Sequence, residues 1–263
     1  MKIETDNNLI KLGSLEISDW CAIKLLGDED KVEDFLQSQL TSDINEMQDN
    51  SSHLSSICDY KGQVLADFIL HKQKKIFFVI INEGLVNTFQ KELEIFAKFG
   101  SVKFEISEKK IIGEIVNSDD TKPSYCSNEQ FQLNVMLKEP DFISKNIISL
   151  NQWFAAHKIL GIYLLDVSES GKYRPIEINY DKFRVSFEKG CYRGQEIIAR
   201  MHYLGINRRK FCTFISNKDF IENSMIKVIG DTINIDNKKI FNGIVKRDNL
   251  TNVSKIPEII SII

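Results

Sequence analysis

Short apolar stretches of strand length follow one another through the first half of the chain, and two stretches with helical spacing interrupt them. The order strand, helix, strand, strand occurs over residues 20–71 and again over residues 75–116. The connections between strands are too short for the crossovers of a large doubly wound sheet. The pattern therefore predicts an α+β fold with two similar modules, each an antiparallel sheet with helices on one face.

The helical stretches are recognised by apolar residues one turn apart and by their end signals. The first, within residues 28–44, begins with acidic residues that can cap a helix. The second ends at Gly100 and a third, residues 150–161, ends at Gly161, since glycine commonly ends helices. Between two of the predicted strands, Lys61-Gly62 marks a hairpin turn.

The last part of the chain has a different character. After Gly205 no helical spacing remains, and five short strand-like stretches follow with turns between them. This pattern is typical of a small β-barrel or sandwich. We therefore expect two units, an α+β core over residues 1–205 and a C-terminal β-barrel over residues 206–263.

Composition bounds the class of protein. The chain has 263 residues, of which 43% are hydrophobic and 27% charged, as in ordinary globular proteins. The longest apolar run, residues 76–81, is too short to span a membrane, and the N-terminal residues do not form an apolar signal region. Five cysteines without a C-x-x-C pair and four scattered histidines favour reduced thiols over disulfides or a metal site. We expect a cytoplasmic protein without a bound metal.

Positive charge is concentrated in one segment. Residues 182–210 contain eight Lys or Arg and two Glu, a local balance of +6 in a chain whose net charge is -3. Such a segment on an acidic body suggests an anionic ligand, either a small carboxylated or phosphorylated molecule or an RNA backbone. A solvated basic face is the alternative on charge alone.

One cysteine lies in the middle of this segment, in "FEKGCYRGQEIIARMHYLG". We expect a strand that ends at Gly190 and a helix that begins near Cys191 to Gly194. Cys191 would then lie at a helix N-terminus between Lys189 and Arg193, where the dipole and the cations favour a thiolate. The local spacing identifies no activating base and no resolving thiol, so the cysteine is predicted to be accessible without a defined reaction.

The same helix start could contact a planar ligand. Gly190 and Gly194 permit close approach of a ligand to the backbone, and Gln195 and Glu196 can hydrogen-bond a heterocycle. The chain has two tryptophans that could stack on such a ligand, Trp20 and Trp153. Ordinary burial habits would place both in the core.

Lys189 to Arg200, "KGCYRGQEIIAR", resembles the K-G-C-Y-x-G-Q-E signature of the YgfZ family, folate-binding relatives of the aminomethyltransferase (T-protein) of glycine cleavage. "FLQSQLTSDI", "CDYKGQVLADF", "RPIEINYDKFRVSF" and "HYLGINRR" are similar to other family segments in the same order. The resemblance covers nearly the whole chain. In the loop before the signature, however, Ile176 stands where the family usually has glutamine.

The resemblance implies a fold and a set of site residues. It implies two ferredoxin-like modules and a C-terminal β-barrel in a three-domain ring around a folate-sized hole. Tetrahydrofolate would lie there against Trp20 and Trp153, near Gln195 and Glu196, with its carboxylates near Arg193 and Arg200. The residues implicated in activity are Lys189, Cys191 and Tyr192.

The resemblance also implies a function. It points to an accessory protein for the maturation or repair of iron–sulfur enzymes, including enzymes that thiolate tRNA, and hence to a role in tRNA modification. The first alternative is a folate-dependent one-carbon transferase that uses Cys191, although the sequence identifies no match to the transferase's catalytic aspartate. The second alternative is an RNA-binding module that uses the basic segment.

Overall fold

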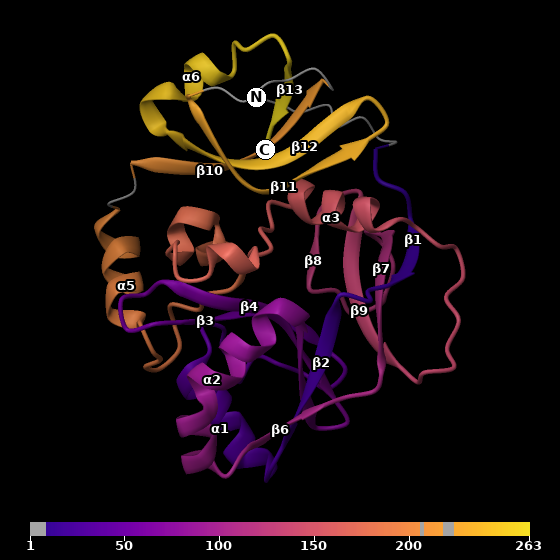
Figure 1. Cartoon of the computed structure of the whole chain (residues 1–263), viewed down its shortest axis with the longest axis vertical. Coiled ribbons are helices and arrows are strands. Elements are labelled where there is room, and N and C mark those ends of the chain that lie inside the picture. The colour runs from indigo at the N-terminus through magenta and orange to yellow at the C-terminus, as the bar shows by residue number, and fades with distance from the viewer. Residues whose placement is uncertain (1–8, 206–207, 218–223) are drawn as a thin grey trace.

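The computed structural model describes residues 9–205, 208–217 and 224–263. These residues form a mixed α/β fold with three antiparallel sheets and helices packed on them. Figure 1 shows the first sheet with α1 and α2 at the bottom, the second sheet with α3 at the right, and the third sheet at the top. The three sheets surround the middle of the molecule, where the segment after α3 also lies.

The first sheet contains five strands in the order β3-β4-β5-β2-β6. Their bounds are Trp20–Leu26 (β2), Ser52–Cys58 (β3), Val64–Gln73 (β4), Ile76–Asn82 (β5) and Lys103–Ile106 (β6). All four pairings are antiparallel, as the short connections predicted. The predicted hairpin is confirmed: β3 and β4 are joined by a turn in which Gly62 has φ +72°, a conformation that favours glycine.

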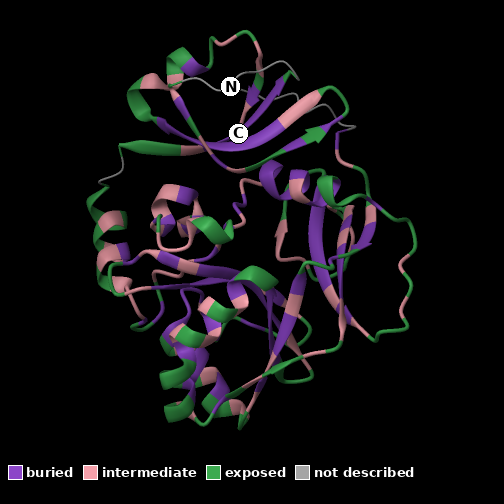
Figure 2. Ribbon diagram, in the orientation of Figure 1, coloured by how far each residue is buried: buried purple, intermediate pink, exposed green. Residues whose placement is uncertain are grey.

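Two helices pack beside this sheet. Helix α1 (Glu29–Gln39) and helix α2 (Glu83–Gly100) contact each other, and α2 also contacts β4 and β5. Helix α2 follows the prediction to its last residue, Gly100, whereas α1 ends five residues before the expected limit. Figure 2 shows that the outward faces of both helices are exposed, while the strands beside them are largely buried.

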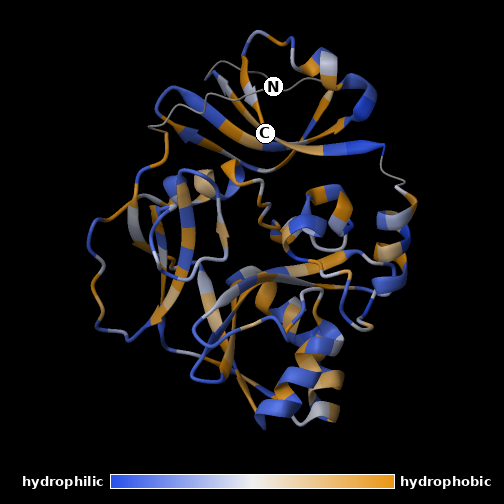
Figure 3. Cartoon of the chain, turned by 180° about the vertical axis from the view of Figure 1, so that it is seen from behind, coloured by the Kyte–Doolittle hydropathy of each residue, from blue (hydrophilic) through white to orange (hydrophobic). Residues whose placement is uncertain are grey.

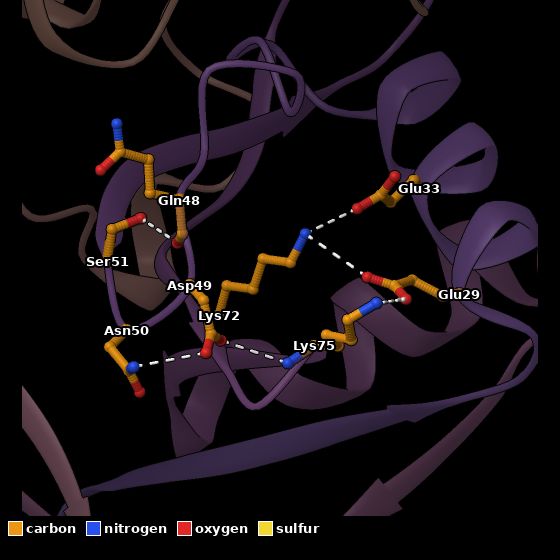
Figure 4. Close-up of polar contacts among 8 residues, drawn as sticks. All are labelled: Glu29, Glu33, Gln48, Asp49, Asn50, Ser51, Lys72 and Lys75. Atoms are coloured by element: carbon orange, nitrogen blue, oxygen red, sulfur yellow. Dashed lines mark hydrogen bonds and ion pairs between the residues drawn. The ribbon is translucent and has the colours of Figure 1, made fainter.

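A group of charged side chains holds α1 against the β4–β5 hairpin (Figure 4). The ammonium of Lys72 lies 2.7 Å from Glu33 and 3.8 Å from Glu29, and Lys75 lies 3.1 Å from Glu29. The backbone amide of Lys75 also donates to Asp49, at 3.2 Å. Since Glu29 and Glu33 of α1 both have lysine partners here, this group stabilises the packing of α1 on the hairpin.

The second sheet has the order β1-β7-β9-β8. Its strands are Gly13–Glu16 (β1), Lys110–Asn117 (β7), Cys126–Ser127 (β8) and Phe131–Lys138 (β9), and helix α3 (Leu150–Ile159) packs on β7. The side chain of Ser149 caps α3 by accepting from the backbone amide of Gln152. This helix carries Trp153, His157 and Lys158, so its position decides where these side chains lie.

The third sheet has the order β11-β12-β10-β13 and comes from the end of the chain. Its strands are Arg209–Asn217 (β10), Ile226–Ile235 (β11), Lys238–Lys246 (β12) and Ile259–Ile262 (β13), with the short helix α6 (Leu250–Val253) before β13. The described strands form an open four-stranded sheet, and no closed barrel is found among them. Residues of β11 and β12 share a hydrophobic cluster with α3, so this sheet packs firmly on the rest of the molecule.

The segment that links α3 to the third sheet contains little regular structure. It includes two short 3-10 turns (Val167–Glu169 and Pro175–Ile178), helix α4 (Tyr180–Phe183) and helix α5 (Gln195–Leu204). The view from behind, in Figure 3, shows hydrophobic and hydrophilic residues mixed along this segment, α5 included.

The predicted strand at 183–190 is wrong. Helix α4 covers its first residue, and the rest pairs with no strand within the described ranges. The amide of Ser186 donates to Thr41 O (2.9 Å), and the hydroxyl of Thr41 donates to Arg184 O (2.6 Å). The Arg184 guanidinium donates to the carbonyls of Ser55 (2.9 Å) and Phe68 (2.8 Å). Individual bonds from buried polar side chains therefore replace a strand ladder, and they hold an irregular backbone in place.

Candidate functional site

A cavity of about 160 Å³ lies where the three parts of the molecule meet. Its lining comes from β2, β4 and β5 of the first sheet, from α3 and the residues after it, and from β11 of the third sheet. These residues are Asp19, Trp20, Asp67, Asn82, Phe154, His157, Lys158, Ile162, Leu164, Leu165, Asp166, Val167, Gly230, Asp231 and Ile233. Segments far apart in the sequence thus contribute to one site, as is common for ligand pockets.

The cavity combines an aromatic wall with acidic groups. Trp20, at the start of β2, is 8% exposed and is the one tryptophan in the lining. Four carboxylates line the cavity, those of Asp19, Asp67, Asp166 and Asp231, against one ammonium, that of Lys158. Such a lining favours a flat ligand with hydrogen-bond donors and disfavours a ligand group with negative charge.

Asp67, on β4, is the most buried of these carboxylates and is 6% exposed. Its carboxylate lies 2.9 Å from the guanidinium of Arg184, which is 1% exposed and stacks on the ring of Tyr180 at 4.6 Å. Burial raises the pKa of Asp67, and the positive charge of Arg184 opposes that rise. The wall of the cavity therefore includes the carboxylate of a buried ion pair, whose cation, Arg184, lies outside the lining.

His157 and Lys158, consecutive residues of α3, are the basic groups of the cavity. Nδ1 of His157 lies 2.8 Å from Trp153 O, and Nε2 lies 2.8 Å from the Tyr125 hydroxyl. Burial lowers the pKa of His157 to about 3, so the imidazole is neutral. Burial also lowers the pKa of Lys158, to about 8, while Asp231 opposes that shift.

Trp153 lies behind this wall and not in it. It is fully buried at 0% exposure, and its ring meets the ring of His157 edge-on at 4.6 Å. A Cβ atom on Gly113 of β7 would lie 2.9 Å from the Trp153 ring, so glycine is needed there for close packing. Trp153 thus supports His157 from within the core, as ordinary burial habits predict, and the two tryptophans do not face one common space.

The loop 189–194 lies at a second place, beside the ends of α1 and β3. Lys189 is 6% exposed, and its ammonium donates to Leu40 O (2.7 Å) and Ser42 O (2.9 Å), carbonyls that follow the C-terminus of α1. The ammonium also lies 5.2 Å from the centre of the Tyr192 ring. Burial lowers the pKa of Lys189 to about 8. Its position suits a residue that fixes the loop, because helix C-termini attract cations.

Arg193 fixes the other end of the loop. Its guanidinium donates to Cys58 O at 2.6 Å and lies 3.1 Å from the carboxylate of Glu92 on α2. Gly194 follows with φ +86°, and a Cβ atom there would lie 2.4 Å from Asp59 O. The backbone therefore passes so close to the β3–β4 turn that only glycine fits.

Between these two fixed ends, Cys191 is exposed and Tyr192 is buried. The predicted accessibility of Cys191 is confirmed. The helix was expected to begin near Cys191 to Gly194; α5 begins at Gln195 with Gly194 as its N-cap, so Cys191 lies three residues before the helix N-terminus and not at it. Burial raises the pKa of the Tyr192 hydroxyl, which has no hydrogen-bond partner among the described residues.

The remaining residues predicted to bind folate lie on α5. Gln195 and Glu196 form its first turn, and Arg200 pairs with Glu196 at 2.7 Å on the exposed face of the helix. None of these residues, and none of the 189–194 loop, lines the cavity. The structure thus separates the predicted site residues into two groups, with Trp20 at the cavity and the signature segment elsewhere.

Sequence reasoning missed Asp67, His157, Lys158 and Arg184 as site residues. Asp67 and Lys158 each lie within apolar segments, so a charged residue inside a predicted buried strand or helix was the available signal. Over the described parts of the chain, no group of three or more His, Cys, Asp or Glu side chains could hold a metal ion. No helix in those parts is both long and apolar enough to cross a membrane.

Comparisons with known proteins give two kinds of likeness. No family model matches the chain. The chain is 28% identical over 249 residues to the tRNA-modifying protein YgfZ of Colwellia psychrerythraea, covering 81% of this chain and 76% of that protein. It is 30% identical over 224 residues to the tRNA-modifying protein YgfZ of Buchnera aphidicola, covering 73% and 70%.

The second likeness is structural. Aminomethyltransferase T of the glycine cleavage system from Bartonella henselae matches with a TM-score of 0.63 and 13% identity, covering 91% of this chain and 80% of that one. At this identity the match shows a shared fold alone.

Proposed function

This chain belongs to the YgfZ family, and we propose that it is a cytoplasmic accessory protein that binds tetrahydrofolate or a derivative. In this proposal it supports the maturation or repair of iron–sulfur enzymes. Through clients that thiolate tRNA it contributes to tRNA modification, the activity that names its relatives. The observation that carries the folate part is the cavity at the junction of the three sheets, with Trp20 and buried Asp67 in its wall.

The shape and charge of the cavity favour one end of a folate. A volume of about 160 Å³ is smaller than the roughly 300–1,000 Å³ of pockets that enclose a drug-sized ligand. The cavity would therefore take the flat pterin ring and leave the glutamate tail outside. A pterin ring has amino and ring N–H donors, which suit the acidic lining, whereas the tail carboxylates would be repelled by it.

The finer fold proposal is two ferredoxin-like modules and a C-terminal barrel in a ring. Support for the first module comes from its element order, β2-α1-β3-β4-β5-α2-β6, in which β3 is an additional strand at the edge of the sheet and the other strands are neighbours in the order β4-β5-β2-β6. Support for a ring comes from the cavity, since all three sheets or the helices on them contribute to its wall. The open third sheet is the part that departs from the proposal.

The signature segment has a separate role in the proposal. Lys189 and Arg193 hold the loop by donating to the backbone of residues 40, 42 and 58, so Cys191 is presented at the surface between two fixed points. An exposed thiol on a fixed loop can reach a partner protein. We propose that Cys191 acts there on a client iron–sulfur enzyme, while the folate occupies the cavity.

The folate proposal is tested by fluorescence titration with tetrahydrofolate. Each of the variants Trp20→Phe and Trp153→Phe retains one tryptophan as a probe, because the chain has two. We expect saturable quenching in wild type and in Trp153→Phe, and little quenching in Trp20→Phe. Calorimetry should show binding weakened about threefold to tenfold by Trp20→Phe, because the phenyl ring offers less stacking surface than the indole. Absence of binding to wild type would refute the folate proposal.

The thiol proposal is tested in cells that depend on this protein for a tRNA-thiolating iron–sulfur enzyme. Cys191→Ala should lower the thiolated fraction of tRNA while the level of folded protein stays unchanged. The matched control is Cys126→Ala, which changes a less exposed thiol on the second sheet. Full thiolation in the Cys191→Ala strain would refute a role for this thiol.

A second candidate function is a folate-dependent one-carbon transferase. It is favoured by Asp67, a carboxylate inside the cavity, but Asp67 is already paired with Arg184 and Cys191 does not line the cavity. Turnover of a labelled one-carbon tetrahydrofolate by the purified protein, lost in Cys191→Ala, would support it. The RNA-binding alternative is weakened, because Arg184, Lys189 and Arg193 of the basic segment donate to backbone carbonyls.

A further inference from the structure

Lys158 is a buried lysine with too few acceptors. It is 8% exposed, and one acceptor, Oδ1 of Asn242, lies at hydrogen-bond distance (2.8 Å) from its ammonium among the described residues. An ammonium has three donors, and burying donors without partners costs free energy. Asp231 influences Lys158 electrostatically, but no carboxylate of the described residues lies within 4.0 Å of the ammonium. Lys158 therefore has donors left for another acceptor.

The surroundings keep this side chain in place. Asn242 is 0% exposed, and its amide nitrogen donates to the hydroxyl of Thr213 at 2.9 Å. That hydroxyl in turn donates to the backbone carbonyl of Lys158 at 2.6 Å. The three residues form a closed buried chain between α3 and the third sheet. The ammonium is thus positioned by the fold before any ligand binds.

Lys158 also lines the cavity, together with Trp20 and Asp231. The missing acceptor can therefore come from a ligand in that space. Because four carboxylates line the same cavity, a neutral oxygen is a better partner than a carboxylate. A pterin ring has such an oxygen, the 4-oxo group, on the same edge as donors that suit the aspartates.

We propose that Lys158 donates a hydrogen bond to the 4-oxo oxygen of a bound pterin and makes the cavity select 4-oxo pterins over 4-amino analogues. The inference rests on the proposed function, since it assigns the chemistry by which the proposed folate site recognises its ligand. A 4-amino group places a donor opposite the ammonium, so the analogue loses a hydrogen bond and leaves the lysine without its acceptor.

The test compares tetrahydrofolate with its 4-amino-4-deoxy analogue by calorimetry, on wild type and on Lys158→Met. Wild type should bind the 4-oxo ligand tenfold or more tightly than the analogue, since a hydrogen bond from a charged donor is strong. Lys158→Met should bind the 4-oxo ligand about tenfold more weakly and should discriminate less than threefold. Methionine keeps the unbranched apolar stem and removes the buried ammonium, so the variant is expected to fold, and near-ultraviolet circular dichroism checks this.

Two controls make the result specific. Lys227→Met removes a lysine that donates to the Tyr173 hydroxyl (2.9 Å) outside the cavity lining, and it should retain the full preference. Tetrahydropteroate, which lacks the glutamate tail, should lose as much affinity in Lys158→Met as tetrahydrofolate does. If only tetrahydrofolate is weakened, Lys158 binds the tail carboxylate and the inference is wrong.

The remaining outcomes also decide the question. Equal binding of both ligands by wild type, or a preference kept by Lys158→Met, overturns the inference and leaves folate binding intact. Binding of neither ligand by wild type overturns the proposed function and the inference with it.

Discussion

Lys158 at the cavity and Lys189 in the signature loop are both buried lysines, and burial lowers the pKa of each to about 8. They differ in how many acceptors they meet. Lys189 donates to two carbonyls and lies against the face of the Tyr192 ring. Lys158 donates to one side-chain oxygen and otherwise borders the cavity. The number of satisfied donors thus separates a lysine that holds a loop from a lysine that can hold a ligand.

The comparison extends to the other charged groups of the molecule. In the signature segment, Arg184, Lys189 and Arg193 all donate to backbone carbonyls of distant segments. At the cavity, the exposed carboxylates of Asp19 and Asp231 remain open to a ligand. A long signature motif can therefore specify how a loop is held, while residues outside the motif face the ligand.

Arg184→Met is expected to have the largest effect, because Arg184 is the most completely buried of these cations. The variant leaves the carboxylate of Asp67 buried without its partner and removes three hydrogen bonds to carbonyls. Loss of one member of a buried ion pair typically costs about 3–5 kcal/mol. Urea unfolding should show a fall of that size in the free energy of unfolding.

The double variant Asp67→Asn with Arg184→Met tests the cause of that fall. Removing the orphaned charge should restore at least a third of the lost stability, since asparagine needs no counter-charge. A single variant that loses less than about 1 kcal/mol would show that the ion pair contributes little, and that the loop is held by other contacts.

Lys189→Met and Lys158→Met test the comparison of the two lysines directly. Lys189→Met should lower the free energy of unfolding by about 1.5–3 kcal/mol, because it removes two hydrogen bonds from a charged donor. Lys158→Met should cost less than about 1 kcal/mol, because one hydrogen bond is lost and a poorly solvated charge goes with it. Urea unfolding of both variants checks the order.

Ligand binding should show the reverse order. Tetrahydrofolate affinity should stay within twofold of wild type in Lys189→Met and should fall in Lys158→Met. A Lys189→Met protein that is as stable as wild type but fails in cells as Cys191→Ala does would refute this view, because Lys189 would then act chemically and not as a support.

The sequence predicted the regular parts of this molecule well. The strands of the first sheet, the turn at Gly62 and the ends of α2 and α3 follow from apolar spacing and glycine, which are local signals. Cys191 is exposed as expected. Local signals failed where individual hydrogen bonds between distant segments hold the backbone, as between the Thr41 hydroxyl and the Arg184 carbonyl. Such hydrogen bonds leave no periodic pattern in the sequence. The alternating pattern of residues 183–190 was therefore the one available signal, and it predicted a strand.

The site was harder to predict for the same reason. Trp20 and Lys158 are separated by more than half of the chain, and they share a cavity only because α3 packs between the sheets. A tryptophan at a predicted ligand position can also lie behind the wall, as Trp153 does. Whether a particular side chain is buried depends on how whole helices and sheets pack together. The spacing of residues along one element carries no information about that packing.

The stability of the protein at low pH depends in part on His157 in the cavity wall. Burial lowers the pKa of this histidine to about 3. In the unfolded chain this histidine would bind a proton below about pH 6.5. Between these values the unfolded state binds more protons than the native state, so the free energy of unfolding falls as pH falls. His157→Gln should remove the part of that fall that this histidine causes, about 2 kcal/mol between pH 6.5 and 4.5.

The measurement is urea unfolding of wild type and variant across that pH range. His53 and His71 also have lowered pKa values, so His71→Gln is the matched control and should flatten the profile by a separate amount. Identical profiles for wild type and His157→Gln would mean that folding leaves the pKa of His157 unchanged, and that its imidazole is not held neutral by burial.

The smallest effect on stability is expected for Cys191→Ser, because the thiol is exposed. The free energy of unfolding should stay within about 0.5 kcal/mol of wild type. Alkylation of the native protein should instead depend entirely on this residue. One thiol should react fast and vanish in Cys191→Ser, since burial raises the pKa of Cys58 to about 12 and those of Cys21 and Cys126 to about 11.

Cys58 makes this measurement a test of the loop as well. It is fully buried, its carbonyl accepts from Arg193, and a Cβ atom on Gly194 would lie 3.3 Å from its Cβ. If Lys189 and Arg193 hold the loop over this thiol, Lys189→Met should let Cys58 react faster, while Lys158→Met should not. Peptide mass spectrometry after timed alkylation distinguishes the two thiols. If alkylation of Cys58 is equally slow in both lysine variants, the loop stays closed without Lys189. The two lysines would then differ in ligand binding alone.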